Sequence, residues 1–512
     1  NRSLLSKFFK SLDDGIADHL DPPLHPSLDP QKVLSGNFAP VGELPPTDCK
    51  IVEGSIPSSL RGAYIRNGPN PQFVPRGPYH LFDGDGMLHV LTIDGGKQEA
   101  VFCSRFVTTN KYDAEREAGY AYFFSAFTAL NGFLPYMART LVVLFRFLAG
   151  DFDIHRGFGA ANTSLFHFAG KLFALVESDL PYEVELTPDG DVITLSRHDS
   201  FGGPFRVMTA HPKIDPDSGE AFAFRQCFKF PFLVYFRIDP RGNKQPEVPI
   251  TSLKDFSLIH DFAITQNYAI FPDTQIVVRP GNVLKSQPLI TVDSGKSPRL
   301  GILPRNAEDD EGICWVEVPG FNMVHAVNAW EEDGGDTIVV VATNVEGLEK
   351  ALLEMDSSRG SIDMIRINVK EKTARWTPLS TSNLEYAVIN NRYVGRKNRY
   401  VYAGIGAPMP KISGVVKLDL LKLTDAYSAG DCTAARRLFK QGCYGGEPYF
   451  VARDPNDTQN DEDDGYVLSY IHDENIGESS FIIMDAKSPE LDVLATVKLP
   501  RRVPYGFHGI FV

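Results

Sequence analysis

Four of the twelve histidines lie in settings that suit metal binding. They occupy apolar or turn-flanked ends of expected strands, and they are His211, His260, His325 and His508. Their separations of 49, 65 and 183 residues exclude a local motif in which two histidines share one helix face. Such wide spacing fits ligands that different sheets contribute one at a time. A single histidine is more often structural than a ligand, so the four carry the hypothesis only as a set.

The elements that would position these histidines are predicted to be short antiparallel strands. Residues 87–93 lead through Asp94-Gly95-Gly96 into 101–106, and 184–186 lead through a P-D-G turn into 192–195. Turns of this composition between β-branched or aromatic runs are hairpin signals. The pattern continues over more than 400 residues, which is more than a two-sheet sandwich needs. Radial repetition in a β-propeller protects sheet edges, so an all-β propeller is the predicted architecture.

Two segments have the periodicity of helices instead. Residues 1–20 carry apolar side chains at the spacing of one helix face. Residues 121–150 are densely apolar with Arg139 and Arg146 as their only charged side chains, and Pro135 is expected to divide them into two helices. The predicted organisation is an N-terminal amphipathic helix and extended lead-in over 1–35. A single domain over 36–512 follows, with an apolar helical insertion at about 121–150.

Composition narrows the possible partners and the compartment. The net charge of −14 argues against nucleic acid, whose phosphates need a basic surface. The six cysteines are scattered without a C-x-x-C pair, as expected for reduced thiols in a cytosolic or plastid-like compartment. No apolar window is long enough for a transmembrane helix. Since the chain begins at Asn1 rather than Met, we expect a leading segment, such as a transit peptide, to be missing.

Ordered motifs along the chain resemble those of the carotenoid cleavage dioxygenase family. They are G-N-F-A-P-V (36–41), R-N-G-P-N-P (66–71), H-L-F-D-G-D-G-M (80–87), A-H-P-K (210–213), H-D-F-A-I-T (260–265), N-A-W-E (328–331), G-G-E-P (445–448), E-D-D-G-Y (462–466) and R-V-P-Y-G-F-H-G-I-F (502–511). Within the family the chain is most similar to the plant plastoglobule subfamily that forms volatile ionone-type ketones. The resemblance therefore implies a plastid location.

The resemblance implies a seven-bladed β-propeller with a helical cap over an iron site. His211, His260, His325 and His508 would then ligate Fe(II), and three glutamates would stand behind the ligands: Glu177, Glu385 and Glu447. Dioxygen would be the co-substrate and a carotenoid or apocarotenoid the substrate, with scission at the 9,10 or 9′,10′ bond.

This chemistry suits the residue types. Four neutral imidazoles leave the full charge on the metal, and carboxylates behind them fix the ring tautomers and offset that charge. No further reductant is needed, because the alkene supplies the electrons that reduce dioxygen.

Other functions are compatible with the same motifs. A stilbene-cleaving dioxygenase or a non-oxidative isomerase would share the fold, although the P-D-P-C-K segment of the isomerohydrolases is not found. A non-catalytic propeller scaffold is a third hypothesis, and all seven matched positions argue against it. Each glutamate taken alone would be an ordinary carboxylate at the end of a strand.

A substrate with negligible solubility in water must be drawn from a lipid phase. We expect residues 121–150 to make peripheral contact with a membrane or plastoglobule surface through an apolar face that includes Phe124, Phe127 and Phe145. Arg139 and Arg146 lie seven residues apart and would meet phosphates from one shared face. The alternative is a buried pair of cap helices. No protein partner is evident.

Overall fold

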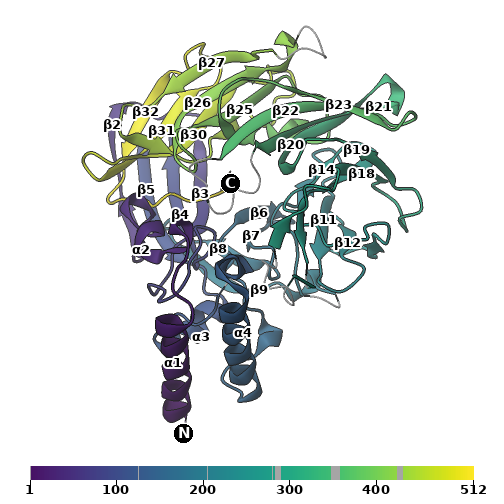
Figure 1. Cartoon of the computed structure of the whole chain (residues 1–512). Helices are drawn as coiled ribbons and strands as arrows, with labels where there is room; N and C mark the ends of the chain where they lie inside the picture. The colour runs from purple at the N-terminus through teal and green to yellow at the C-terminus, as the bar shows by residue number, and fades with distance from the viewer. Residues whose placement is uncertain are drawn as a thin grey trace.

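The computed structural model describes residues 2–124, 126–203, 206–279, 281–282, 290–346, 354, 358–423 and 430–512. Most of its regular structure consists of short antiparallel strands, which form seven blades around a common centre (Figure 1). The predicted all-β, seven-bladed propeller with a helical cap is thereby confirmed.

In each of the first four blades, neighbouring strands pair in the order in which they are named here. Blade one contains β33 (Gly509–Phe511), β3 (Arg61–Pro69), β4 (Gly86–Asp94), β5 (Glu99–Phe106) and β1 (Leu44–Asp48). Blade two contains β6 (Ser164–Phe168), β7 (Lys171–Leu175), β8 (Tyr182–Leu186) and β9 (Val192–Arg197). Blade three contains β10 (Lys213–Ile214), β11 (Ala221–Gln226), β12 (Leu233–Ile238) and β13 (Val248–Pro249). Blade four contains β14 (Ala263–Ile264), β15 (Tyr268–Asp273), β18 (Arg299–Pro304) and β19 (Cys314–Glu317). A separate two-stranded sheet follows β15 and contains β16 (Ile276–Val278) and β17 (Ile290–Val292).

The remaining three blades complete the ring. Blade five contains β20 (Met323–Glu332), β21 (Thr337–Glu346), β22 (Arg359–Asn368) and β23 (Thr373–Pro378). Blade six contains β24 (Leu384–Val388), β25 (Tyr400–Gly406), β26 (Ile412–Asp419) and β27 (Thr433–Leu438). Blade seven contains β29 (Tyr449–Ala452), β30 (Gly465–Asp473), β31 (Glu478–Asp485), β32 (Val493–Lys498) and β2 (Lys50–Gly54). A short strand, β28 (Cys443–Gly445), pairs with both β26 and β30 and so joins blades six and seven.

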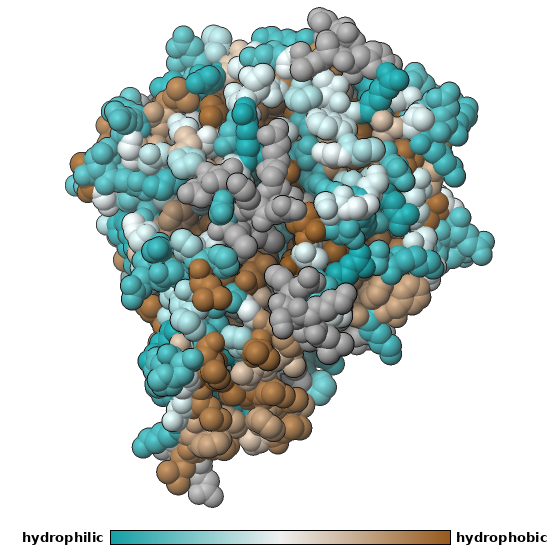
Figure 2. Space-filling model, in the orientation of Figure 1, coloured by the Kyte–Doolittle hydropathy of each residue, from teal (hydrophilic) through white to brown (hydrophobic). Residues whose placement is uncertain are grey.

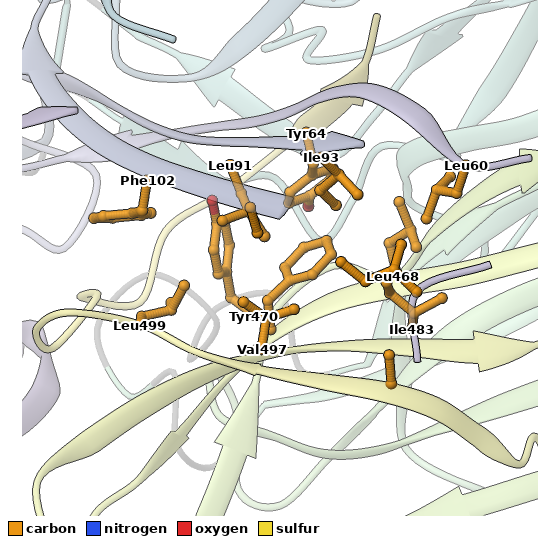
Figure 3. Packing of buried hydrophobic residues seen from close by; sticks show 14 of the residues in the cluster. Leu60, Tyr64, Leu91, Ile93, Phe102, Leu468, Tyr470, Ile483, Val497 and Leu499 are labelled. Atoms are coloured by element: carbon orange, nitrogen blue, oxygen red, sulfur yellow. The ribbon is translucent and has the colours of Figure 1, made fainter. Parts of the chain in front are cut away.

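The two ends of the chain close the ring. The C-terminal β33 pairs with β3 in blade one, and the N-terminal β2 pairs with β32 in blade seven. Between these blades lies a buried apolar cluster to which blade one contributes Leu91 and Phe102 and blade seven contributes Tyr470 and Val497 (Figure 3). Burial of a large apolar side chain is worth roughly 1.5–3 kcal/mol, so this cluster stabilises the junction of the first and last blades.

The helices lie outside the blades, and two of them project together from one side of the propeller (Figure 1). The α-helices are α1 (Arg2–His19), α2 (Pro30–Val33), α3 (Asn110–Ala118) and α4 (Phe133–Leu148). The 3₁₀ helices are η1 (Pro26–Leu28), η2 (Gly36–Phe38), η3 (Ala126–Asn131), η4 (Ile154–Arg156), η5 (Asp199–Phe201), η7 (Asp333–Gly335), η9 (Asn391–Tyr393) and η10 (Leu420–Lys422). Among the described residues, no helix combines the length and apolarity needed to span a membrane.

The apolar insertion divides at a different residue from the one predicted. η3 ends at Asn131 and α4 begins at Phe133, with Gly132 between them at a φ of 150°. Pro135 lies in the first turn of α4, where the N–H that proline lacks has no partner within the helix. The break is therefore at Gly132 rather than at Pro135.

One face of α4 packs inward and the other is exposed. Val142 of α4 contacts Phe9 and Ile16 of α1 in a small buried cluster. The opposite face is apolar and open, with Leu134 79% exposed, Phe145 54% and Leu148 69%. Figure 2 shows hydrophobic residues gathered at the end of the molecule where α1 and α4 lie.

The prediction that Arg139 and Arg146 point outward to lipid phosphates is wrong. Both lie on one face, as their spacing requires, but this is the face that packs inward. The Arg146 side chain is 0% exposed and forms ion pairs with Asp13 (2.9 Å) and Asp151 (2.6 Å). Arg139 forms an ion pair of 2.6 Å with Asp21. The acidic groups that pair with these guanidiniums, two of them near the N-terminus, explain why both arginines face the protein.

Candidate metal centre

Four blades each bring one histidine to the centre of the ring. His211 lies two residues before β10, His260 three residues before β14, and His508 immediately before β33, while His325 is the third residue of β20. Each therefore lies where the chain enters a terminal strand of its blade. One side-chain nitrogen from each of the four lies within 4.8 Å of the others. The structure thus brings together all four histidines that the sequence singled out.

The nitrogens that face the centre are close enough to share one ion. His260 Nε2 lies 3.0 Å from His211 Nε2 and 3.2 Å from His325 Nε2. The ring of His508 lies 4.7 Å from that of His211 and 5.1 Å from that of His325, measured between ring centroids. The imidazoles therefore surround one point.

The three predicted glutamates stand behind three of the histidines. Glu177 Oε1 lies 2.5 Å from His260 Nδ1, Glu385 Oε1 lies 3.0 Å from His325 Nδ1, and Glu447 Oε1 lies 2.8 Å from His508 Nδ1. Glu177 follows β7 in blade two, Glu385 belongs to β24 in blade six, and Glu447 precedes β29 in blade seven. Each of the seven blades thus supplies one of the seven predicted residues.

Backbone contacts fix two of these carboxylates further. Glu447 Oε2 accepts a hydrogen bond of 2.8 Å from the N–H of Gly509, the residue after His508. Glu385 Oε2 accepts one of 2.5 Å from the N–H of Tyr386, whose φ of 55° lies in the left-handed region. Residues other than glycine rarely adopt this backbone conformation, and those that do are often found at functional sites.

Charge and burial set the protonation of the centre. Burial would raise the pKa of Glu385, but the electrostatic interaction and hydrogen bond with His325 and the hydrogen bond from Tyr386 outweigh it and lower the pKa to about 2. Burial also acts to raise the pKa of Glu177, but the electrostatic interaction and contact with His260 bring the pKa below its usual value. Burial and the neighbouring histidines hold the pKa of His211 well below its usual range, so this imidazole is neutral.

The donor set fits a bound metal cation. Because Nδ1 of His260, His325 and His508 faces a carboxylate, that nitrogen carries the hydrogen and Nε2 directs its lone pair to the centre. Lone pairs about 3 Å apart repel one another unless a cation or a proton lies between them. Imidazole nitrogens suit zinc, copper, iron and nickel, so these residues could hold an ion of that class.

Aromatic side chains connect the centre to the helical cap. The ring of Phe507, the residue before His508, lies 5.6 Å from that of Phe82, which lies 5.2 Å from Phe127 in η3. Phe127 also stacks on His80 at 5.0 Å. Phe127 therefore packs toward the propeller instead of facing lipid as predicted, and Phe124 packs against Tyr136 at 5.2 Å.

A cavity of about 160 Å³ opens on another side of the histidines. It is lined by residues of the central strands and of the segments that enter them: Ser164, Leu165, Ala210, His211, Pro212, Lys213, Val388, Glu447, Tyr449, His508 and Gly509. The cavity thus borders two of the four histidines, His211 and His508.

Sequence reasoning missed two residues beside the centre. The Tyr386 ring lies 5.9 Å from that of His508 and 6.4 Å from that of His325. Arg66 is buried behind the segment that carries His508. Arg66 is the first residue of the R-N-G-P-N-P motif, and this motif was the only sequence signal that could have identified it.

Comparison with known proteins decides the family. Residues 38–512 match the family described as retinal pigment epithelial membrane protein. The whole chain is 52% identical to a probable carotenoid cleavage dioxygenase 4, chloroplastic, of Arabidopsis thaliana, and covers 85% of that protein. The chain belongs to the carotenoid cleavage dioxygenase family.

Other relatives of this carotenoid cleavage dioxygenase carry different names. A 9-cis-epoxycarotenoid dioxygenase, chloroplastic, of Oryza sativa is 51% identical over 100% of the chain and 80% of that protein. A carotenoid 9,10(9′,10′)-cleavage dioxygenase of Phaseolus vulgaris is 38% identical over 96% of the chain and 91% of that protein. The word chloroplastic in the Arabidopsis and rice names supports the predicted plastid location.

Solved structures agree with the fold. A variant of the apocarotenoid oxygenase of Synechocystis superposes with a TM-score of 0.76 at 25% identity, covering 95% of this chain and 99% of that one. Membership of this family and the similarity to this oxygenase identify the protein as an enzyme of the dioxygenase class. The hypothesis of a non-catalytic scaffold is therefore not supported.

Proposed function

We propose that this enzyme cleaves a double bond of a carotenoid or apocarotenoid with dioxygen and releases two carbonyl products. The observation that carries this proposal is the convergence of four imidazole nitrogens, backed by three carboxylates, at the centre of a propeller of this family. The names of the relatives supply the substrate class.

The proposed cofactor is ferrous iron, held by His211, His260, His325 and His508. Two nitrogens that each lie about 2.1 Å from one ion are about 3.0 Å apart at a right angle and about 3.4 Å apart at a tetrahedral angle. The distances of 3.0 and 3.2 Å between Nε2 atoms fall within this range, so His211, His260 and His325 could share one ion. Imidazole ligands suit iron, which would supply the redox chemistry that dioxygen activation needs.

The chain's own residues orient the ligands. When bound, the iron supplies the redox chemistry that activates dioxygen, and the alkene supplies the electrons. Glu177, Glu385 and Glu447 fix the ring tautomers and offset the charge of the ion. The aromatic rings of Phe82, Phe127 and Phe507 pack against one another beside the centre, and an apolar surface of this kind suits a polyene.

For the scissile bond we propose the 9,10 position, the 9′,10′ position or both. The Phaseolus relative is named for these bonds, whereas the rice relative is named for another substrate. The test is product analysis after the iron-loaded enzyme acts on β-carotene and on an apocarotenal. We expect ionone-type ketones together with the matching aldehydes. Isomerised but unsplit substrate would refute the reaction type, whereas products of another scission would refute only the bond.

We further propose that the exposed face of α4, with help from α1, contacts a membrane or plastoglobule surface in the plastid. This face carries Leu141, Leu144, Phe145 and Leu148, all of them exposed, and Leu4 and Phe8 of α1 are exposed as well. Since both arginines of the insertion are engaged in ion pairs with acidic residues of the protein, the contact would depend on apolar burial and only weakly on lipid charge.

A triple substitution tests this contact. Leu144→Gln, Phe145→Gln and Leu148→Gln together should reduce co-sedimentation with phosphatidylcholine vesicles at least about tenfold, because each side chain would lose roughly 1.5–3 kcal/mol of burial. The matched control replaces Leu421, Leu438 and Ile476, which are similarly exposed elsewhere, by glutamine. Equal vesicle binding by the two triple variants would refute the contact.

A further inference from the structure

Among the described residues, Arg66 is a buried positive charge that forms no ion pair. Its side chain is 2% exposed, and within the described part of the chain it forms no ion pair with a carboxylate. Its Nη2 donates a hydrogen bond to the carbonyl oxygen of Pro504, its guanidinium lies 5.0 Å from the ring centre of Tyr470, and its Nε has no hydrogen-bond partner. The buried Arg146 and Arg225, by contrast, pair with carboxylates. An unpaired buried charge costs several kcal/mol, so its presence calls for a compensating role.

The guanidinium lies directly behind one arm of the metal centre. A Cβ added to Gly446, the residue before Glu447, would lie 3.6 Å from Arg66 Nη1. A Cβ added to Gly506, two residues before His508, would lie 2.8 Å from Arg66 Nε. In the sheet Arg66 is paired with Gly509, the residue after His508. The arginine is thus enclosed by the segments that carry Glu447 and His508.

With a divalent ion bound, the metal centre would have a net negative charge that Arg66 could offset. Three ionised carboxylates carry three negative charges, whereas a divalent ion with four neutral imidazoles carries two positive charges. One negative charge is left over, and it favours a trivalent ion over a divalent one. A fixed positive charge nearby opposes that preference.

We propose that the buried charge of Arg66 balances the three carboxylates and so holds the bound iron in its ferrous state. This inference rests on the proposed function, because it takes the ion to be iron. The process that Arg66 suppresses is the loss of one electron from ferrous iron to dioxygen, which gives ferric iron and superoxide.

The expected effect is measurable. For a separation on the order of 10 Å and an effective dielectric constant of about 20, one unit charge changes the ferrous–ferric equilibrium roughly tenfold. The experiment loads wild type, Arg66→Gln, Arg66→Lys and Arg225→Gln with ferrous iron under nitrogen, confirms equal iron content, and then admits air without substrate. The growth of the high-spin ferric signal in electron paramagnetic resonance gives the oxidation rate, and a redox titration gives the midpoint potential.

Arg66→Gln should oxidise several-fold faster than wild type and have a lower midpoint potential. Arg66→Lys keeps the charge and should behave like wild type. Arg225→Gln should also match wild type, because it removes an equally buried arginine that pairs with Glu247 in blade three. If the potential and the oxidation rate of Arg66→Gln equal those of wild type, the inference fails. Wild type that binds no iron would instead refute the proposed function.

A double variant separates charge from packing. Glu447→Gln should raise the midpoint potential, and combining it with Arg66→Gln should return the potential toward that of wild type. If Arg66→Gln alone does not fold, a folded, iron-loaded double variant supports charge balance. If the double variant also fails to fold, the packing of the guanidinium is what matters, and the inference is overturned.

Discussion

Replacing Glu385 by glutamine tests whether the carboxylates support the metal centre through their charge. Both oxygens of Glu385 lie near His325 Nδ1, at 3.0 and 3.2 Å, and Oε2 also accepts the N–H of Tyr386. In glutamine one of these positions becomes an NH₂ group. If the amide oxygen keeps the Tyr386 contact, the NH₂ group faces the N–H of His325, donor to donor. The substitution therefore removes one charge-assisted hydrogen bond without changing the size of the side chain.

The size of the effect follows from that lost bond. A hydrogen bond to a charged group is worth about 1.5–3 kcal/mol, which corresponds to roughly a 10–100-fold loss of metal affinity. The assay is competition between the apoprotein and a chelator of known affinity for ferrous iron, performed without oxygen.

Glu331→Gln is the matched control. Glu331 lies on the same strand as His325, but its carboxylate contacts Thr265 and Asn267 instead of a histidine. We expect this variant to keep the affinity of wild type. The reasoning would be refuted if Glu385→Gln bound iron as tightly as wild type, or if Glu331→Gln lost as much affinity.

Two further predictions concern binding and stability. His211→Ala should reduce iron content below about a tenth of wild type while leaving the circular dichroism of the fold unchanged, and iron retained at the wild-type level would refute its assignment as a ligand. Asp215 contacts Arg305 (2.6 Å) and Arg396 (3.0 Å), so Asp215→Asn should lower the free energy of unfolding by about 2 kcal/mol at neutral pH. Burial acts to raise the pKa of Asp215, but its hydrogen bonds, above all those from Arg305, outweigh it and lower the pKa from 3.8 to about 2. The difference between the two proteins should therefore be full above pH 3.8 and shrink as the pH falls toward 2; a difference that does not change with pH would contradict the assignment.

Local sequence signals predicted the blades well because hairpins are local. The expected pair 87–93 and 101–106 corresponds to β4 and β5, and 184–186 and 192–195 correspond to β8 and β9. The closure of the ring could not be predicted in the same way. Gly509 pairs with Arg66, and no local periodicity connects residues so far apart in the chain.

For the candidate site as well, the sequence predicted which residues take part but not how they are arranged in space. The sequence and its resemblance singled out all four histidines and three glutamates, and the structure brings them together in space. The pairing of each glutamate with its histidine could not be predicted, because it depends on how the blades are arranged around the centre: Glu385 and Glu447 pair with histidines of neighbouring blades, whereas Glu177 of blade two pairs with His260 of blade four. Arg66 was missed for a related reason: its surroundings come from Gly446 and Gly506, at the other end of the chain.

Helical periodicity identified α4 but assigned its two arginines to the wrong environment. Spacing of seven residues establishes that Arg139 and Arg146 share a face and says nothing about what covers that face. The acidic residues Asp13 and Asp21 cover it, and they come from the N-terminal segment more than a hundred residues earlier. Long-range ion pairs of this kind leave no trace in the local pattern.

In the proposed reaction, both oxygen atoms added to the cleaved alkene come from dioxygen at the four-histidine centre. The most direct measurement is a single turnover of the iron-loaded enzyme with β-carotene or an apocarotenal under isotopically labelled dioxygen. The carbonyl products are reduced immediately to alcohols, before they exchange oxygen with water, and are analysed by mass spectrometry. We expect one labelled oxygen in each of the two products. Unlabelled products, or an isomer of the substrate with its chain intact, would contradict it.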